Sequence, residues 1–349
     1  MGFPFIIQIM EEKRHFDRST ILKIILGVVL GGLTIYLAFR GVSFSQLGMV
    51  LSKATPWMIT VGIGIVLVNV ATITFRWWLM LLRDWKISEF RSLLGGVYLG
   101  QMFNILLPAR LGELARIYFV SERIEITKSG LLGSLVLEKV IDFITFGVAI
   151  FVMIMAVSLP AWVSESSKTL LWLALISGLG VLLLVLWGDR ILARFTPFLK
   201  HLPTAWGERI TGILERALTG FDSMRDWKRH FPIWLLSFFS LVLSTLTNYV
   251  ILEAIEIQVP FIASLFVLIV LQVGSAPPSA PGKLGVFHYL AVLALSVFSV
   301  EKNLALAYGV LLYVIALLPK VLIGVGVLIF SRWKLPSLRF IEDQPFERK

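Results

Sequence analysis

Charged side chains suited to binding an anion gather in the stretch LPARLGELARIYF, at residues 107–119. Pro108 suits the first turn of a helix, and a helix that begins there turns unpaired N–H groups toward the preceding break, where they favour an anion. Arg110 and Arg116 add formal charge, and a guanidinium group can hold phosphate through two parallel hydrogen bonds. We therefore expect both arginines to contact an anionic headgroup, with Glu113 holding Arg116 from three residues away. The alternative is a basic membrane loop with a surface ion pair.

A second charged group, LEKVID, lies inside a long apolar segment at 130–159. Glu138 and Asp142 are one helical turn apart and share a helix face, and Lys139 has the spacing to pair with Asp142. Charges within a membrane span are costly and usually mark a pathway or a paired interior. The pattern favours an ion network with a functional or gating role. The alternative places the start of this segment in the membrane interface, with the charges at headgroup depth.

The third group, APPSAPGKLGVFHY at 276–289, interrupts another apolar segment. Its prolines lack backbone N–H groups and its glycines permit unusual backbone angles, so a continuous helix is disfavoured. Within a membrane, broken backbone is tolerated where protein buries it or where it lines a cavity. Freed carbonyls and a helix start near Gly282 would meet a polar headgroup, with Lys283 as a point charge. The alternative is a purely structural kink.

Arg76 stands in TFRWWLMLLRDW, toward the end of an apolar segment. Arginine and tryptophan together at that place are typical of the membrane interface. We therefore interpret Arg76 as an interfacial anchor beside Trp77 and Trp78, and a role in binding as the alternative.

Composition identifies the class of protein that must position these groups. The chain has 349 residues, of which 57% are hydrophobic and 15% charged, and its mean hydropathy is +0.86. Soluble domains carry about a quarter charged residues, so the sequence predicts an all-α polytopic membrane protein. The net charge of +10 lies in loops beside apolar segments, which favours topology signals and anionic lipid over nucleic acid.

Cofactor and metal sites find little support in the sequence. The chain has no cysteine, which excludes disulfides and cysteine metal sites, and its four histidines are scattered without ligand spacing. We expect no metal and no other cofactor.

Apolar segments long enough to cross a bilayer predict six full spans. They cover residues 21–39, 56–82, 130–159, 168–188, 231–255 and 304–330. Two further segments, 92–108 and 261–300, are interrupted, and we interpret each as a re-entrant helical hairpin. An alternative reads the second of them as two separate spans, at 261–277 and 284–300.

Pro108 and Gly112 have the same spacing as Pro278 and Gly282, each pair at a break in an apolar segment. Paired interrupted helices in two halves of a membrane protein are typical of transporters built from inverted repeats. Chance is the alternative, because this short spacing is common.

Lysine and arginine are concentrated in alternate loops, which places both termini in the cytoplasm under the positive-inside rule. The expected organisation is a cytoplasmic segment at 1–20, one transmembrane domain at 21–330 and a cytoplasmic tail at 331–349. Charged and apolar residues alternate at helical spacing in 189–230, which predicts an amphipathic helix on the cytoplasmic membrane surface.

The motifs FRWW, GQMFNILLPARLGELAR, LEKVIDF and PPSAPGKLGVFHY occur in this order between about residues 60 and 330. Together they resemble the lysylphosphatidylglycerol synthase transmembrane, flippase-like family. The residues that match the family's pattern are Arg76, Asn104, Pro108, Arg110, Gly112, Glu113, Arg116, Glu138, Asp142, Pro278, Pro281, Gly282 and Gly285. The arginine expected near Tyr313 is missing, with Lys320 as the nearest basic residue, and three matched positions depart in residue type. Lys139 stands where the family often has arginine, Lys283 replaces a glycine, and His288 stands where glutamate is common.

The resemblance implies that all of these residues contribute to a substrate site. It implies a flippase that moves an anionic phospholipid or a polyprenyl-phosphate-linked lipid across a prokaryotic inner membrane. The expected partners are membrane lipids, with a homo-oligomer or a lipid synthase as further possibilities. We expect no soluble aminoacyl-transfer domain of the kind that the synthase members carry, because only residues 331–349 follow the last predicted span. The alternative function is a membrane enzyme, or enzyme subunit, that acts on a lipid-linked sugar or aminoacyl lipid, and a scaffold for a lipid synthase is a third reading.

Overall fold

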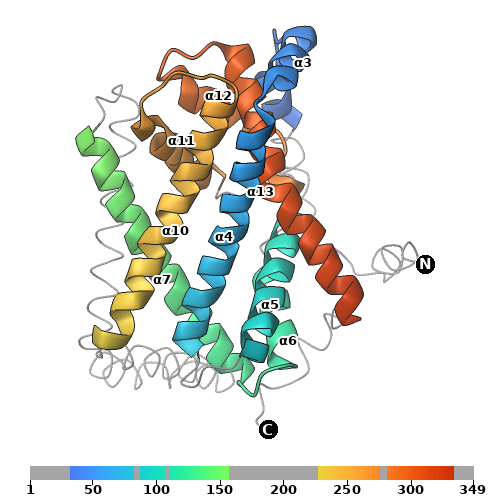
Figure 1. Cartoon of the computed structure of the whole chain (residues 1–349), viewed down its shortest axis with the longest axis vertical. Helices are drawn as coiled ribbons and strands as arrows, with labels where there is room; N and C mark the ends of the chain where they lie inside the picture. The colour runs from blue at the N-terminus through green and yellow to red at the C-terminus, as the bar shows by residue number, and fades with distance from the viewer. Residues whose placement is uncertain (1–31, 82–86, 107–110, 157–226, 276–280, 334–349) are drawn as a thin grey trace, which may run out of the picture.

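A computed structural model describes residues 32–81, 87–106, 111–156, 227–275 and 281–333. Figure 1 shows long helices running side by side along the molecule, with shorter helices packed between them and at one end. Every regular element in these ranges is helical, so the predicted all-α fold is confirmed. The prolines at 108, 277 and 278 and Arg110 lie outside the described residues, as do residues 189–226 of the predicted amphipathic segment, whose last residues, 227–230, begin α10.

Four of the helices are long and apolar enough to cross a bilayer. They are α4 (Pro56–Leu81), α7 (Lys128–Ala156), α10 (Trp227–Ala254) and α13 (Lys302–Ser331). They match four of the six predicted spans, since each offers more than the roughly 20 residues that a crossing needs. Of the remaining two, 21–39 is described and helical only from residue 32, and 168–188 lies outside the described residues.

The first interrupted segment forms a helical hairpin of α5 (Ile87–Leu106) and α6 (Gly112–Ser121). The two helices approach closely because glycine faces glycine: a Cβ added to Gly112 would collide with the Gly100 carbonyl oxygen and with the Asn104 side chain. The Gly112 N–H donates to Asn104 Oδ1 at 2.9 Å, which satisfies a backbone donor at the start of α6. This hairpin therefore depends on small residues at its contact.

The second interrupted segment contains α11 (Phe261–Gly274), the 3₁₀ turn η3 (Pro281–Lys283) and α12 (Val286–Ser296). At a rise of about 1.5 Å per residue, neither α11 nor α12 reaches the length of a full span. The two helices pack against each other, so their lengths favour a hairpin over two spans.

Broken backbone is confirmed in the described part of the proline-rich stretch. Gly282 and Gly285 have φ values of 70° and 83°, and Lys283 has a φ of 57°, all in the left-handed region that glycine adopts most readily. The Gly282 carbonyl accepts a hydrogen bond from Tyr313 Oη at 2.8 Å. This bond fixes the break against α13, and η3 also contacts α5 of the first hairpin.

The described loops gather at two opposite ends of the helices (Figure 1). At the α3 end, helix α3 (Phe44–Lys53) is joined to the start of α13, since the Ser43 N–H donates to Asn303 Oδ1 at 3.3 Å. At the Trp333 end, the ring of Trp333 packs edge-on against Phe119 of α6, with 5.5 Å between centroids. The first hairpin, α5 with α6, lies toward the Trp333 end, and the second, α11 with α12, lies toward the α3 end (Figure 1).

Candidate functional site

A cavity of about 390 Å³ lies among α4, α5, α6, α7, α10, α11 and α13. Most of its lining side chains are polar, although the surrounding helices are apolar. The polar lining comprises Asn69, Arg76, Gln101, Asn104, Glu113, Arg116, Glu138, Lys139, Asp142, Thr145, Ser237, Ser240, Ser244, Gln272 and Lys320. A polar cavity enclosed by membrane spans is the usual setting of a transport or binding site.

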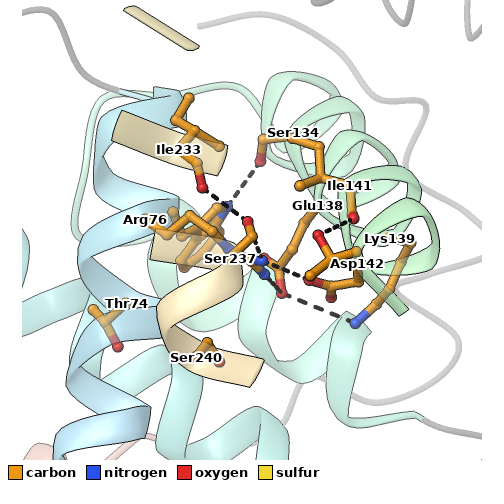
Figure 2. A network of polar contacts seen from close by, with 12 residues as sticks. Thr74, Arg76, Ser134, Glu138, Lys139, Ile141, Asp142, Ile233, Ser237 and Ser240 are labelled. Carbon is orange, nitrogen blue, oxygen red and sulfur yellow. Dashed lines mark hydrogen bonds and ion pairs between the residues drawn. The ribbon is translucent and has the colours of Figure 1, made fainter. Parts of the chain in front are cut away.

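Arg76 is a buried ion-pair partner, so its interpretation as an interfacial anchor is wrong. Only 2% of the residue is exposed. Its Nη1 donates to Asp142 Oδ1 at 2.5 Å and to Ser237 Oγ at 2.9 Å, and its Nη2 lies 3.7 Å from Glu138 Oε1. Figure 2 shows the side chain reaching from α4 between α7 and α10 toward these groups. The acidic face of α7 holds the guanidinium inside the molecule.

Arg116 of α6 makes a paired contact with Glu138 of α7. Its Nη1 lies 3.3 Å from Oε1 and its Nη2 lies 3.0 Å from Oε2 of the carboxylate. The guanidinium also stacks over the Trp77 ring, with Cζ 3.6 Å from the ring centroid. Both charged residues are buried, and buried charges are tolerated when they are paired in this way.

Glu113 occupies a different place in the network from the one predicted. Its Oε2 lies 4.0 Å from Arg116 Nη1, so the predicted pair is present, but Glu138 is the closer partner of Arg116. Glu113 Oε1 instead lies 3.1 Å from Lys139 Nζ and accepts from Asn104 Nδ2 at 3.5 Å. The predicted pairing of Lys139 with Asp142 is therefore replaced by pairing with Glu113.

The network balances three basic side chains against three carboxylates. Its members are Arg76, Arg116, Lys139, Glu113, Glu138 and Asp142. Two members are open to the cavity: the side chains of Lys139 and Asp142 are 50% and 41% exposed, whereas that of Glu138 is 4% exposed. Glu138 and Asp142 share one helix face, as the spacing predicts. Lys139 and Asp142 are therefore the most exposed members of the network.

A neutral polar wall faces the network from α4 and α10. Asn69 Nδ2 donates to Ser244 Oγ at 3.0 Å, and Ser240 Oγ donates to Asn69 Oδ1 at 2.7 Å. Asn248 belongs to the same face of α10 and accepts from Tyr308 Oη at 2.7 Å. These side chains make the cavity wall polar without adding charge.

A second cavity, of about 300 Å³, continues toward the second hairpin. Both cavities are lined by Asn69, Gln101, Asn104, Ser244, Leu268, Gln272 and Lys320. The second is also lined by Gly282 and Lys283 of the broken stretch, where Lys283 Nζ donates to Ser275 Oγ at 3.0 Å. The polar space therefore extends from the ion network on α7 to the break between α11 and α12.

The structure brings most of the sequence-predicted residues into this space. Arg76, Asn104, Glu113, Arg116, Glu138, Lys139, Asp142, Gly282 and Lys283 line one cavity or the other. Gly112 serves the α5–α6 contact, and Gly285 precedes α12. Pro108, Arg110 and Pro278 lie outside the described residues, and Pro281 is described only as the start of η3.

His288 lies apart from both cavities. Its ring packs against Tyr313, Phe287 and Phe39, with centroids 5.2, 6.1 and 6.2 Å away. It is buried, and it belongs to the aromatic packing between α12 and α13.

Eight polar residues of the first cavity were not predicted from the sequence: Asn69, Gln101, Thr145, Ser237, Ser240, Ser244, Gln272 and Lys320. The neutral ones carry no signal in a hydropathy profile, because isolated serine and amide residues occur throughout apolar helices. Lys320 did carry a signal, since an ionisable residue deep within an apolar span indicates a functional site.

Comparison with known protein families agrees with this geometry. The family model described as the lysylphosphatidylglycerol synthase TM region matches residues 24–324. Comparison with curated proteins gave no match. The match covers every charged residue of the network and both helical hairpins. The chain is an integral membrane protein that belongs to the lysylphosphatidylglycerol synthase TM region family.

Proposed function

We propose that this protein moves a lipid with an anionic headgroup, either a phospholipid or a polyprenyl-phosphate-linked lipid, across the bilayer. The observation that carries the proposal is the polar space enclosed by apolar spans, which reaches from the α7 network to the broken second hairpin. A headgroup could cross the apolar layer there while its acyl chains stay in lipid. Membership of a lipid-related family supports the same reading.

The charge pattern of the network suits a passing headgroup. Each carboxylate already has a basic partner, so the network can exchange partners with a ligand without leaving a charge isolated. Lys139 and Asp142 are the exposed members. In this proposal they form the first contact, and the buried pair of Arg116 with Glu138 holds α6 and α7 in register.

The two hairpins are proposed to be re-entrant and related as inverted repeats. The support is that α6, α11 and α12 are each shorter than a full span, and that η3 contacts α5, so the two broken regions meet. Broken helices that meet inside a membrane protein are typical of transporter sites. The Trp333 end is proposed to face the cytoplasm of a prokaryotic cell.

Enzymatic modification of a lipid-linked sugar is the competing function. Glu138 and Asp142 lie on one face of one helix, and both contact Arg76. A pair that catalyses glycosyl chemistry flanks its substrate from two sides. The geometry therefore favours transport.

The test is reconstitution of the purified protein in liposomes that carry a fluorescent phosphatidylglycerol in both leaflets. A membrane-impermeant quencher reports movement between leaflets, and mass spectrometry of the extracted lipid reports chemical change. Transport predicts loss of the protected fluorescence with unchanged lipid mass. A modified lipid, formed with its donor present, would instead support the enzyme.

A matched control uses phosphatidylcholine with the same fluorophore, because its headgroup has no net charge. Faster movement of phosphatidylglycerol than of phosphatidylcholine supports the proposal. Vesicles that behave like protein-free ones with phosphatidylglycerol and with a polyprenyl phosphate would contradict it.

A further inference from the structure

Lys320 is a charged residue of the polar space that lies outside the ion network, among the residues that the structure describes. It lies within α13 directly after Pro319, and it lines both cavities. No hydrogen bond or ion pair joins its ammonium group to another described residue. An ammonium group within a membrane span is costly unless a counter-charge compensates it.

The described residues that line the second cavity supply no such counter-charge. Its described lining contains Lys283 and Lys320 but neither aspartate nor glutamate. The three carboxylates of the first cavity are matched by Arg76, Arg116 and Lys139. The described lining of the second cavity therefore carries basic side chains and no carboxylate, which favours an anion.

Uncharged hydrogen-bonding groups surround this excess charge. Gln101 Oε1 is buried with no hydrogen-bond partner among the described residues, and Gln101 lines both cavities. A side-chain amide can turn either its oxygen or its NH₂ group toward a ligand. Gln272 lines both cavities as well and is exposed. A lysine ammonium group and nearby side-chain amides can together donate hydrogen bonds to the oxygens of a phosphate group.

The apolar part of the lining indicates the kind of molecule that carries the phosphate. Val66, Leu268, Leu271, Leu312 and Leu317 share the second cavity with Lys320. Free inorganic phosphate would gain nothing from these side chains, whereas the alkyl part of a lipid would bury apolar surface against them. A cavity of about 300 Å³ is at the lower end for ligand sites, so it suits a phosphate and its ester neighbours.

We propose that Lys320, with Lys283 beside the same cavity, binds the phosphate ester of a membrane lipid. This inference rests on the proposed lipid transport and names the group that recognises the lipid. The site lies between α13 and the second hairpin, and it is separate from the buried pair of Arg116 with Glu138. Recognition of phosphate by a point charge tolerates different attached headgroups.

The test compares variants of the full chain in detergent. Lys320→Met removes the charge and keeps the chain length, Lys320→Arg keeps the charge, and Lys53→Met is the control because Lys53 is exposed at the α3 end. Binding is measured by native mass spectrometry and by the rise in unfolding temperature that a ligand causes. The ligands are phosphatidylglycerol, a diacylglycerol with the same acyl chains, and inorganic phosphate.

We expect Lys320→Met to weaken phosphatidylglycerol binding by about tenfold or more, as loss of a charged hydrogen bond implies. Lys320→Arg and Lys53→Met should bind like the wild type, and diacylglycerol binding should not change. Without lipid, Lys320→Met should unfold at a temperature equal to or above that of the wild type, because an uncompensated charge has been removed.

Three outcomes would overturn the assignment. The first is unchanged phosphatidylglycerol binding by Lys320→Met. The second is a lower unfolding temperature of that variant without lipid, which would make Lys320 a structural residue. The third is inorganic phosphate binding through Lys320 as tightly as phosphatidylglycerol, which would identify a free anion as the ligand.

Transport in liposomes separates this inference from the function on which it rests. If the wild type moves no lipid but binds phosphatidylglycerol through Lys320, the site stands and the proposed function fails. If transport proceeds and Lys320→Met binds like the wild type, the site fails and the function stands.

Discussion

The carboxylate of Glu138 is held from two sides, by the Arg116 guanidinium at 3.0 and 3.3 Å and by Arg76 Nη2 at 3.7 Å. The three residues come from α7, α6 and α4, so one carboxylate joins three separate helices. It is the centre of the ion network, whereas Asp142 and Lys139 are its exposed margin. The consequences for stability and for transport should therefore differ between these residues.

Glu138→Gln should destabilise the folded protein strongly. The substitution leaves Arg116 buried without its paired carboxylate, and breaking a buried ion pair costs roughly 3–5 kcal/mol. Thermal unfolding in detergent measures the effect. Glu122→Gln is the control, since Glu122 pairs with Arg123 at 3.8 Å on the surface and an exposed pair contributes about 0–1 kcal/mol.

Coupling between Arg116 and Glu138 provides a second measure. The double variant Arg116→Gln, Glu138→Gln should be more stable than the sum of the two single effects predicts, because neither partner is then left charged and alone. Residues in contact typically show coupling of about 0.5–3 kcal/mol. Purely additive effects would mean that the pair contributes nothing beyond the two separate residues.

Asp142→Asn should slow transport more than it changes stability. The Asp142 side chain is 41% exposed, so its pair with Arg76 stabilises the fold less than the buried Arg116 pair. The variant also leaves Arg76 with less negative charge beside it, so Arg76 would hold an anionic headgroup longer. We expect a loss in rate of about tenfold, equivalent to ~1.4 kcal/mol in the barrier.

The assay is the liposome measurement of fluorescent phosphatidylglycerol, corrected for the amount of inserted protein. Glu256→Gln is the matched control, because Glu256 is exposed at the α3 end and undergoes the same change from acid to amide. Equal rates for the two variants would remove Asp142 from the transport path.

The apolar segments predicted the architecture well, because chain length and hydropathy decide which helices can cross a bilayer. The four long spans matched within a few residues. Helix periodicity likewise predicted that Glu138 and Asp142 share a face. These properties depend on local sequence alone.

The partners of the charged residues were harder to predict, since they depend on how neighbouring helices are aligned. Arg76 resembles an interfacial anchor in the sequence because tryptophans follow it and the apolar segment ends nearby. Its true environment is set by α7 and α10, which bring Asp142 and Ser237 to it. Likewise, spacing within one helix predicts Glu113 as the partner of Arg116, and it cannot reveal the closer carboxylate on α7.

Gly112→Ala should prevent close packing of the first hairpin. The added Cβ would collide with the Gly100 carbonyl oxygen and the Asn104 side chain, and the backbone atom cannot move aside without separating α5 from α6. Overpacking of this kind costs about 1–3 kcal/mol, which should lower the unfolding temperature. Gly64→Ala in α4 is the control, because nothing lies within 4 Å of its added Cβ. Equal stability of the two variants would contradict a tight α5–α6 contact.

The Trp333 end should face the cytoplasm. Its described part carries Arg91, Arg123, Lys128 and Arg332, and the sequence adds Arg83 and Lys86 between α4 and α5. The described α3 end carries Arg40, Lys53 and Lys302, and Lys302 donates to the backbone carbonyls of Leu37 and Arg40. Because lysine and arginine near span ends are retained in the cytoplasm, the imbalance predicts this orientation.

Single cysteines test this orientation directly, since the chain contains no cysteine of its own. Glu122→Cys and Ser52→Cys place exposed thiols at the Trp333 end and the α3 end respectively. A membrane-impermeant maleimide should label Ser52→Cys in intact spheroplasts, where the outer face of the inner membrane is accessible, and Glu122→Cys only in inverted vesicles. Ala115→Cys is the control, because Ala115 is buried and should be labelled only after denaturation. Labelling of Glu122→Cys in intact spheroplasts would reverse the orientation, and the ion network would then lie nearer the outer face of the membrane.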